Sequence, residues 1–120
     1  THKDPKKTGS LYGIANIHVS QKPDEEPFIV KVDRMGSQIW REAPPSKDGE
    51  WFEYHIEVVD ENITLRVDGK ITARWTQPEG WNGANASMRG RRIDRGTIAL
   101  QAHDPKSEVH YKNIRIKLLE

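Results

Sequence analysis

Cysteine is absent from the 120-residue sequence, which excludes disulfide bonds and thiolate chemistry. Long hydrophobic runs are absent as well, because no apolar stretch approaches the ~20 residues needed to span a bilayer. The sequence also lacks an excess of charge of one sign, since 19 basic and 18 acidic residues leave a net charge of +1. This balance gives no electrostatic reason to expect nucleic acid or an anionic membrane surface as a partner.

Helical periodicity is hard to find, and alternation with period two takes its place. Hydrophobic residues make up 34% of the chain and charged residues 31%, which suits a thin sheet sandwich of one domain over residues 1–120. The clearest alternation is in residues 51–59, WFEYHIEVV. Its apolar face carries Phe52, Tyr54, Ile56 and Val58. We therefore predict a half-buried strand there.

A hairpin is predicted for residues 62–75, NITLRVDGKITARW, around Asp68 and Gly69. A two-residue loop would put apolar residues of one strand opposite polar residues of the next. A three-residue loop shifts the register by one and creates a common apolar face of Ile63, Leu65, Ile71, Ala73 and Trp75. We therefore predict a three-residue loop with a bulge and with Gly69 at positive φ. Trp51 and Trp75 are expected in the core.

The remaining pattern predicts an antiparallel β-sandwich of the jelly-roll type. Residues 76–95 contain three glycines and no periodicity, which indicates a long loop. Further strands are expected at 10–19, 27–32, 36–40, 97–103 and 108–119. In the last of these the apolar phase changes near Asn113, which indicates a bulge or a change of face.

Five stretches occur in an order that resembles a known family. They are TGSLYG at 8–13, GEWFEYHIEV at 49–58, ITLRVDGK at 63–70, GTIALQAHDP at 96–105 and VHYKNIRIK at 109–117. This series resembles the 3-keto-disaccharide hydrolase domain family, long catalogued as a domain of unknown function. The pair Gly-x-Ile-x-Leu-Gln-x-His and Val-x-Tyr-x-Asn-Ile-x-Ile is its most specific part.

The resemblance implies a concanavalin- or glucanase-like jelly roll of two antiparallel sheets. It also implies that the chain corresponds to the C-terminal portion of a longer domain, so that N-terminal strands are supplied elsewhere or a sheet edge pairs with another chain. The implied setting is bacterial and extracytoplasmic, either periplasmic or secreted. The implied activity is the cleavage of 3-keto-glycosides, in which a base removes the C2 proton, an enediolate forms and the C1 substituent leaves.

The resemblance places His103 in the Leu-Gln-x-His motif, as base, metal ligand or sugar contact. Strand alternation puts Gln101 on the same face, where it would hydrogen-bond a sugar hydroxyl or simply be exposed. Tyr12 and Trp81 are candidate platforms for the C–H face of a sugar, or else core and loop packing. Arg92 belongs to an arginine-rich run that would pair with Asp94 and other carboxylates or contact an oxygen-rich ligand.

No local metal motif accompanies these residues, because the histidines show neither HxH nor HExxH spacing. A divalent metal ion held by His103 and residues from elsewhere in the chain is therefore left open. Asp104 could orient His103 or ligate such a metal, or it could start a turn before Pro105. The leading hypothesis is a 3-keto-glycoside-cleaving enzyme, and its rival is a non-catalytic carbohydrate-binding or interaction module.

Overall fold

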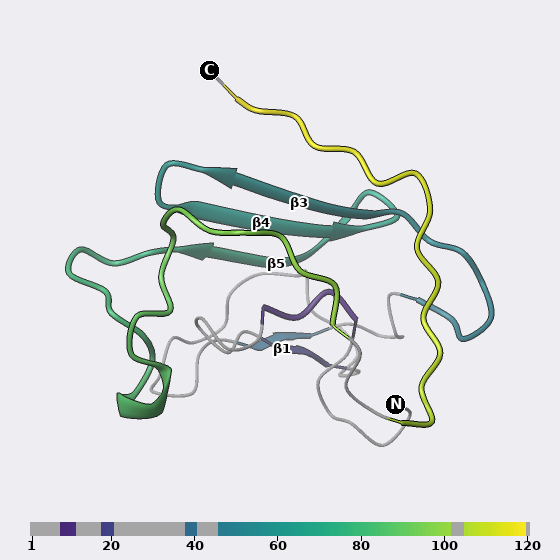
Figure 1. Ribbon diagram of the computed structural model, residues 1–120, viewed down its shortest axis with the longest axis horizontal. Helices are drawn as coiled ribbons and strands as arrows, with labels where there is room; N and C mark the ends of the chain where they lie inside the picture. Colours follow the sequence, from purple (N-terminus) through teal and green to yellow (C-terminus); the bar gives the residue numbers. More distant parts are fainter. Residues whose placement is uncertain (1–7, 12–17, 21–37, 41–45, 102–104, 120) are drawn as a thin grey trace.

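The computed structural model describes residues 8–11, 18–20, 38–40, 46–101 and 105–119, and it confirms the all-β fold class. Its main sheet is antiparallel and has the order β3-β4-β5 (Figure 1). The strands are β3 (Tyr54–Val59), β4 (Asn62–Val67) and β5 (Lys70–Thr76). No helix in the described part of the chain could cross a membrane.

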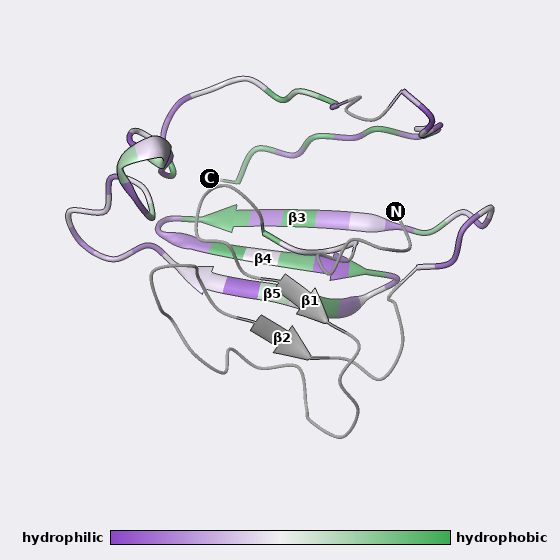
Figure 2. Cartoon of the chain, turned by 90° about the horizontal axis from the view of Figure 1, so that it is seen from below, coloured by the Kyte–Doolittle hydropathy of each residue, from purple (hydrophilic) through white to green (hydrophobic). Residues whose placement is uncertain are grey.

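A second, smaller pair of strands lies beside β5, on the side away from β3 (Figure 2). It consists of β1 (His18–Ser20) and β2 (Gln38–Trp40), which pair in parallel. The sequence predicted antiparallel pairing throughout, so this pair differs from the expectation. β2 falls within the predicted strand at 36–40, and β1 overlaps the end of the predicted strand at 10–19 and extends one residue past it. The predicted strand at 27–32 lies outside the described residues.

The hairpin between β4 and β5 has a two-residue loop, not the three-residue loop predicted from the sequence. Val67 pairs with Lys70, and the loop residues Asp68 and Gly69 both have positive φ, 48° and 76°. Two successive positive φ values are typical of the tight hairpin turn that an Asp-Gly pair favours. The prediction of a positive φ at Gly69 is confirmed, while the predicted loop length is wrong.

A β-bulge further along the hairpin makes the change of face that the longer loop was expected to make. The register passes from Leu65 opposite Ala73 to Arg66 opposite Ile71, so Thr72 is an extra residue on β5. Beyond this bulge Ala73 and Trp75 face the same way as their partners on β4. Ile71 pairs with Arg66 instead, so its predicted place in the common apolar face is wrong.

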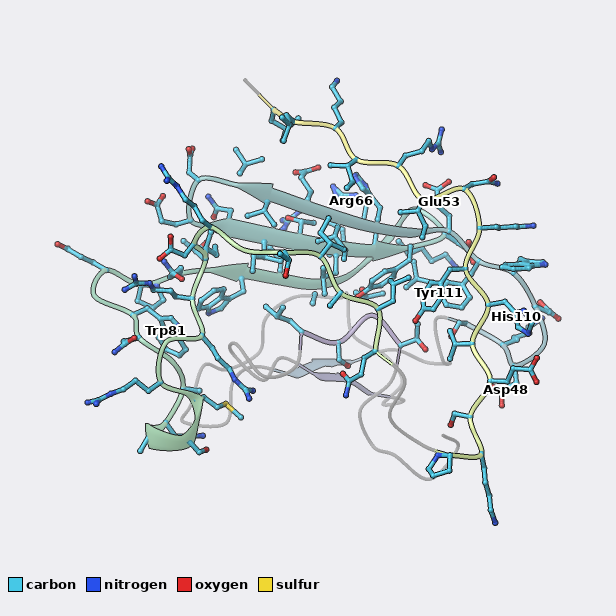
Figure 3. The ribbon with its side chains drawn as sticks, in the orientation of Figure 1. Asp48, Glu53, Arg66, Trp81, His110 and Tyr111 are labelled. Atoms are coloured by element: carbon cyan, nitrogen blue, oxygen red, sulfur yellow. The ribbon has the colours of Figure 1, made fainter. Side chains whose placement is uncertain are left out.

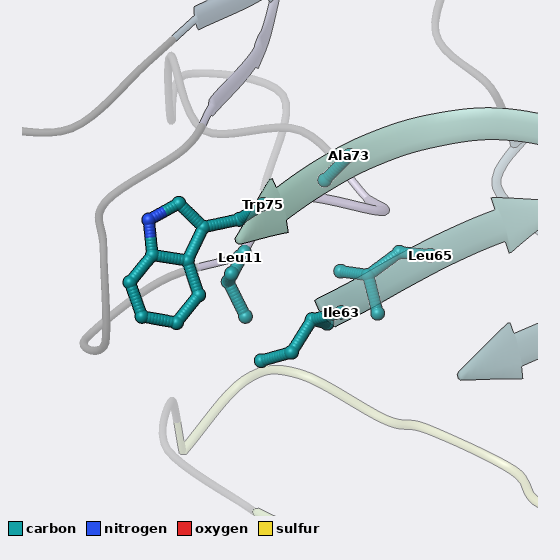
Figure 4. Packing of buried hydrophobic residues seen from close by; sticks show 5 residues of the cluster. All are labelled: Leu11, Ile63, Leu65, Ala73 and Trp75. Atoms are coloured by element: carbon teal, nitrogen blue, oxygen red, sulfur yellow. The ribbon is translucent and has the colours of Figure 1, made fainter. Parts of the chain in front are cut away.

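The core lies on one face of the β4–β5 hairpin. Trp75 and Leu65 are 2% and 3% exposed, and Leu11 comes from the N-terminal part of the chain to cover them (Figure 4). The full cluster is Leu11, Ile63, Leu65, Ala73 and Trp75, with Trp81 and Ile93 packed against it. Burial of large apolar side chains is the main favourable term in folding, so this hairpin is the stable centre of the described structure.

The apolar face continues onto β3 but is not covered there. Tyr54, Ile56 and Val58 pair with β4 residues of the core face, yet they remain 43%, 58% and 45% exposed. Figure 2 shows the alternation of hydrophobic and hydrophilic residues along β3 and β4. Trp51 is 58% exposed, so its predicted place in the core is wrong, whereas that of Trp75 is confirmed. The strand predicted at residues 51–59 is confirmed over Tyr54–Val59, but its apolar face is exposed, so the prediction that this strand is half-buried is wrong.

The two strands predicted to close the chain are not strands in the structure. Residues 96–101 and 107–119 pair with no strand among the described residues. In Figure 1, residues 96–101 pass in front of the main sheet and the C-terminal segment runs beyond β3. Asn113 has a φ of 54°, so the backbone leaves the extended conformation at the residue where a bulge or a change of apolar face was predicted. Their exposed apolar residues are Ile98, Leu100, Val109, Tyr111, Ile114, Ile116, Leu118 and Leu119.

A close approach between Gly9 and Thr72 leads to the first prediction. Gly9 has a φ of 87°, and a Cβ there would lie 2.5 Å from the Thr72 hydroxyl oxygen. We expect Gly9→Ala to lower the free energy of unfolding by about 3 kcal/mol, from both the backbone conformation and the overlap. Gly80→Ala is the matched control, because Gly80 has a φ of 70° and open space around it. Urea unfolding should show a loss of only about 1 kcal/mol for the control, and equal losses would contradict the close approach.

The Asp68 side chain leads to a second prediction. Its Oδ1 atom accepts a 2.8 Å hydrogen bond from the Glu53 backbone N–H, and the Asp68 N–H donates to the Glu53 carbonyl at 3.0 Å. The side chain thus extends the β3–β4 ladder past Tyr54. Asp68→Ala should cost about 2 kcal/mol in urea unfolding, from the lost hydrogen bond and from the positive φ of 48°, which alanine adopts less readily. Asp68→Asn, which keeps an acceptor at Oδ1 and tolerates that φ, should cost much less. Equal losses in the two variants would argue against a role for this hydrogen bond.

Candidate functional site

The site residues predicted from the sequence are only partly within the described structure. Tyr12, His103 and Asp104 lie outside the described residues. Gln101 is exposed and is the last described residue before His103. Trp81 and Arg92 lie together in the loop of residues 77–95, the long loop expected from the sequence. The roles of all these residues in binding or catalysis stay predictions.

Gln77 closes the loop of residues 77–95 at its base. Its backbone N–H donates to the Glu61 carbonyl at 2.7 Å, which continues the β4–β5 ladder beyond Thr76. Its side-chain Oε1 accepts a 2.6 Å hydrogen bond from the Ile93 N–H at the far end of the loop. One residue therefore ties both ends of the loop to the sheet.

A second set of hydrogen bonds orders the interior of the loop. The Gly90 N–H donates to both the carbonyl and the Oδ1 of Asn82, at 3.2 and 3.1 Å. A short 3-10 turn, η1 (Ala86–Met88), follows Asn85, whose Oδ1 accepts from the Ser87 N–H at 3.0 Å. These bonds fold the chain back on itself, so the loop has its own internal structure.

Trp81 anchors the loop to the core. Its ring lies edge-to-face against Trp75, with 5.3 Å between ring centroids and 67° between planes. The indole N–H donates to the Arg91 carbonyl at 3.1 Å. An edge-to-face aromatic pair adds about 0.5–1.5 kcal/mol beyond the buried area. This is the loop-packing role that the sequence left open for Trp81, and it leaves the proposed sugar contact untested.

Arg92 is held by Asp94 within the same loop. Its Nε and Nη2 atoms donate to one carboxylate oxygen of Asp94, at 3.0 and 2.8 Å. The Arg95 backbone N–H donates to the other oxygen at 2.8 Å. That backbone hydrogen bond, followed by the Arg92 side chain, lowers the pKa of Asp94. The guanidinium is thus fixed in orientation, and the Arg92 side chain is 50% exposed.

A further aromatic and charged cluster was not found from the sequence. The exposed Trp51 ring has the Lys112 Nζ atom 4.0 Å above its centre and the His110 ring 6.4 Å away, nearly perpendicular. The His110 Nε2 atom is 2.6 Å from Glu108 Oε1. Figure 3 shows His110 on the side of the molecule where the C-terminal segment passes the loop before β3.

A signal for this cluster was present in the sequence. Glu108, His110 and Lys112 are spaced two residues apart, so they share one face of an extended segment. Sequence reasoning missed the cluster because it assigned Trp51 to the core. An exposed indole next to a carboxylate, an imidazole and an ammonium group offers both an apolar platform and hydrogen-bonding groups, the combination that sugar ligands use.

No metal centre is formed by the part of the chain that the structure describes. No group of three or more histidine, aspartate or glutamate side chains lies close enough there to hold an ion. His103 and Asp104, the two residues for which ligation was considered, are outside that part. The metal hypothesis therefore has no support from geometry, and we build no chemical step on it.

The hydrogen bonds to Asp94 lead to a prediction about pH. Because the folded state lowers the pKa of Asp94, its carboxylate stabilises the fold above the ordinary aspartate pKa, and this contribution is lost as the pH falls through the folded value. A carboxyl carbon titration by NMR should give a midpoint for Asp94 below the ordinary value. Arg92→Ala should raise that midpoint only in part, because the Arg95 N–H remains, and Arg89→Ala should leave it unchanged. An ordinary midpoint in the unmodified protein would contradict the prediction.

Comparison with known proteins gives one match. A search of curated proteins and a search of solved structures each found nothing similar. A family model described as the 3-keto-alpha-glucoside-1,2-lyase-like domain matches residues 1–117. The match covers nearly the whole chain and names the family that the sequence motifs resemble, and the all-β structure agrees with it. The chain therefore belongs to the 3-keto-alpha-glucoside-1,2-lyase-like domain family.

Proposed function

We propose that this chain is a carbohydrate-active domain that cleaves 3-keto-glycosides by proton abstraction and elimination. The observation that carries the proposal is the family match over residues 1–117. The family's description as 1,2-lyase-like fits an elimination across C1 and C2 of the sugar ring. The Leu-Gln-x-His motif at residues 100–103 supplies the histidine that such chemistry needs.

The reaction follows from the acidity that the ketone confers. A C3 ketone acidifies the C2 proton, so a base of moderate strength can remove it. The electron pair of the C2–H bond passes into an enediolate, with negative charge on the C3 oxygen. When the enediolate collapses, the C1–O bond breaks and the leaving oxygen takes up a proton. The catalyst therefore needs a base with a pKa near the working pH and donors for the C3 oxyanion.

We assign the base to His103, because imidazole has the appropriate basicity near neutral pH. Gln101 would hold a sugar hydroxyl, and its exposure at the end of residues 96–101 supports this role. Arg92 would donate to the oxygen-rich substrate, supported by the orientation that Asp94 gives its guanidinium. Trp81 and Tyr12 would contact a C–H face of the sugar.

A non-catalytic carbohydrate-binding module is the second candidate. The exposed Trp51 ring, with Lys112 over its centre and the His110 ring nearly perpendicular to it, favours it because a surface aromatic residue with polar neighbours can bind sugars without chemistry. The two candidates differ in what a substitution removes. The enzyme loses turnover when its base is removed, whereas the binding module has no turnover to lose and depends on its aromatic residues.

Incubation with a 3-keto-glucoside, with and without a chelator, tests the proposal. We expect release of the C1 substituent, followed by NMR, and a loss of at least 100-fold in rate for His103→Ala. His110→Ala is the matched control, since this histidine is exposed and lies in another segment. Circular dichroism should show both variants folded. No product from the unmodified protein under any metal condition would overturn the enzyme proposal.

The binding module is tested with the same proteins and an unreactive glucoside. If the enzyme proposal fails, tryptophan fluorescence should still change on addition of sugar, and Trp51→Ala should abolish that change. Trp81→Phe serves as the comparison, because it retains an aromatic ring against Trp75. Absence of any sugar-dependent change in fluorescence would exclude this second candidate.

A further inference from the structure

β3 forms an open edge of the main sheet. β4 pairs with one side of β3, and none of the described residues forms a strand on the other side. The C-terminal segment of residues 107–119 runs past β3 in Figure 1, but no backbone hydrogen bond joins the two among the described residues. An edge strand with free N–H and C=O groups is a template for pairing with another strand.

The apolar face of the sheet reaches this edge without protection. Ile56, in the middle of β3, is 58% exposed and aligned with Leu65 of the core. Proline, lysine and bulges are the usual devices that block edge pairing, and β3 has none of them over Tyr54–Val59. The bulge of this sheet lies instead at the other end of the strand order, on β5.

The sequence of β3 is complementary to itself in one antiparallel register. A two-fold axis through Ile56 places Tyr54 opposite Val58 of a second copy, and His55 opposite Glu57 of a second copy. Apolar side chains then meet apolar ones on the core face. On the other face an imidazole donor meets a carboxylate acceptor, twice by symmetry.

Other registers lose this match. Moving the axis by half a residue, between Ile56 and Glu57, puts these two residues opposite each other and His55 opposite Val58. Every apolar side chain of β3 would then sit across from a residue of the other face. A parallel arrangement with the same alignment would place His55 against His55 and Glu57 against Glu57, with no complementary pair.

We propose that β3 is a self-association surface on which a second copy of this chain pairs antiparallel through Ile56, joining two sheets into one. Complementarity between the His55 imidazole donor and the Glu57 carboxylate acceptor selects the second copy as the occupant. The paired sheets carry a continuous apolar face across the junction, which buries part of Tyr54, Ile56 and Val58. This proposal does not depend on the proposed activity.

A charge exchange tests both the surface and its register. Sedimentation of the unmodified full chain should show a dimer. His55→Glu places two carboxylates in each cross-strand pair, and Glu57→Lys removes the acceptor. The dissociation constant of each variant's homodimer should therefore be at least tenfold higher than that of the unmodified protein. An equimolar mixture of the two variants places a carboxylate opposite an ammonium group, and should restore a heterodimer to within about threefold of the original dissociation constant.

The controls separate association from folding and from activity. Arg74→Glu reverses an exposed charge on β5, away from the β3 edge, and should leave the dimer unchanged. Thermal unfolding should show the variants folded, since within the sheet His55 pairs with Arg66 and Glu57 with Thr64. A monomer at all concentrations would overturn the proposal, and so would a mixture that fails to re-associate. Slow exchange of β3 amides in such a monomer would show that the chain covers its own edge.

Discussion

The packing of the described structure depends on the extra residue at Thr72. An Asp-Gly turn holds β4 and β5 in a two-residue hairpin, and that register alone would turn Ala73 and Trp75 away from Ile63 and Leu65. The bulge restores the match, so one inserted residue decides whether the largest core side chain is buried or exposed. Gly9 approaches the same residue, which places Leu11 over the hairpin.

Much of the fold could be predicted from alternation alone. β3, β4 and β5 form where apolar and polar residues alternate, and the loop after β5 begins where the alternation ends. These elements were predictable because alternation is a local property of the sequence. The predicted length of the hairpin loop was wrong because a longer loop and a bulge both turn Trp75 toward the core face, and the sequence does not distinguish the two. The prediction of strands at 97–103 and 108–119 was wrong over their described residues. Alternation indicates which face of a segment is apolar, but not whether a partner strand lies beside it.

The sequence supplied candidate site residues, whose roles stay predictions, but not their arrangement. The motif containing Gln101 and His103 identified the family, and the family match over residues 1–117 supports the proposed chemistry. The contact of Trp81 with Trp75 required a structure, since it joins β5 to a loop with no periodicity. The pairing of Arg92 with Asp94, two residues away, was instead one of the alternatives that the sequence offered. Trp51 shows the opposite case: an aromatic residue beside a strand was assigned to the core, yet it lies among charged groups at the surface.

The hydrogen bonds of Gln77 have an evolutionary consequence. Because this residue ties the start of the loop to Glu61 and the end to Ile93, the ends of residues 77–95 are fixed independently of what lies between them. Apart from the Trp81 anchor, insertions or deletions in the interior would leave the register of the sheet untouched. The loop is thus a unit whose length and surface chemistry can change without altering the hairpin that supports it.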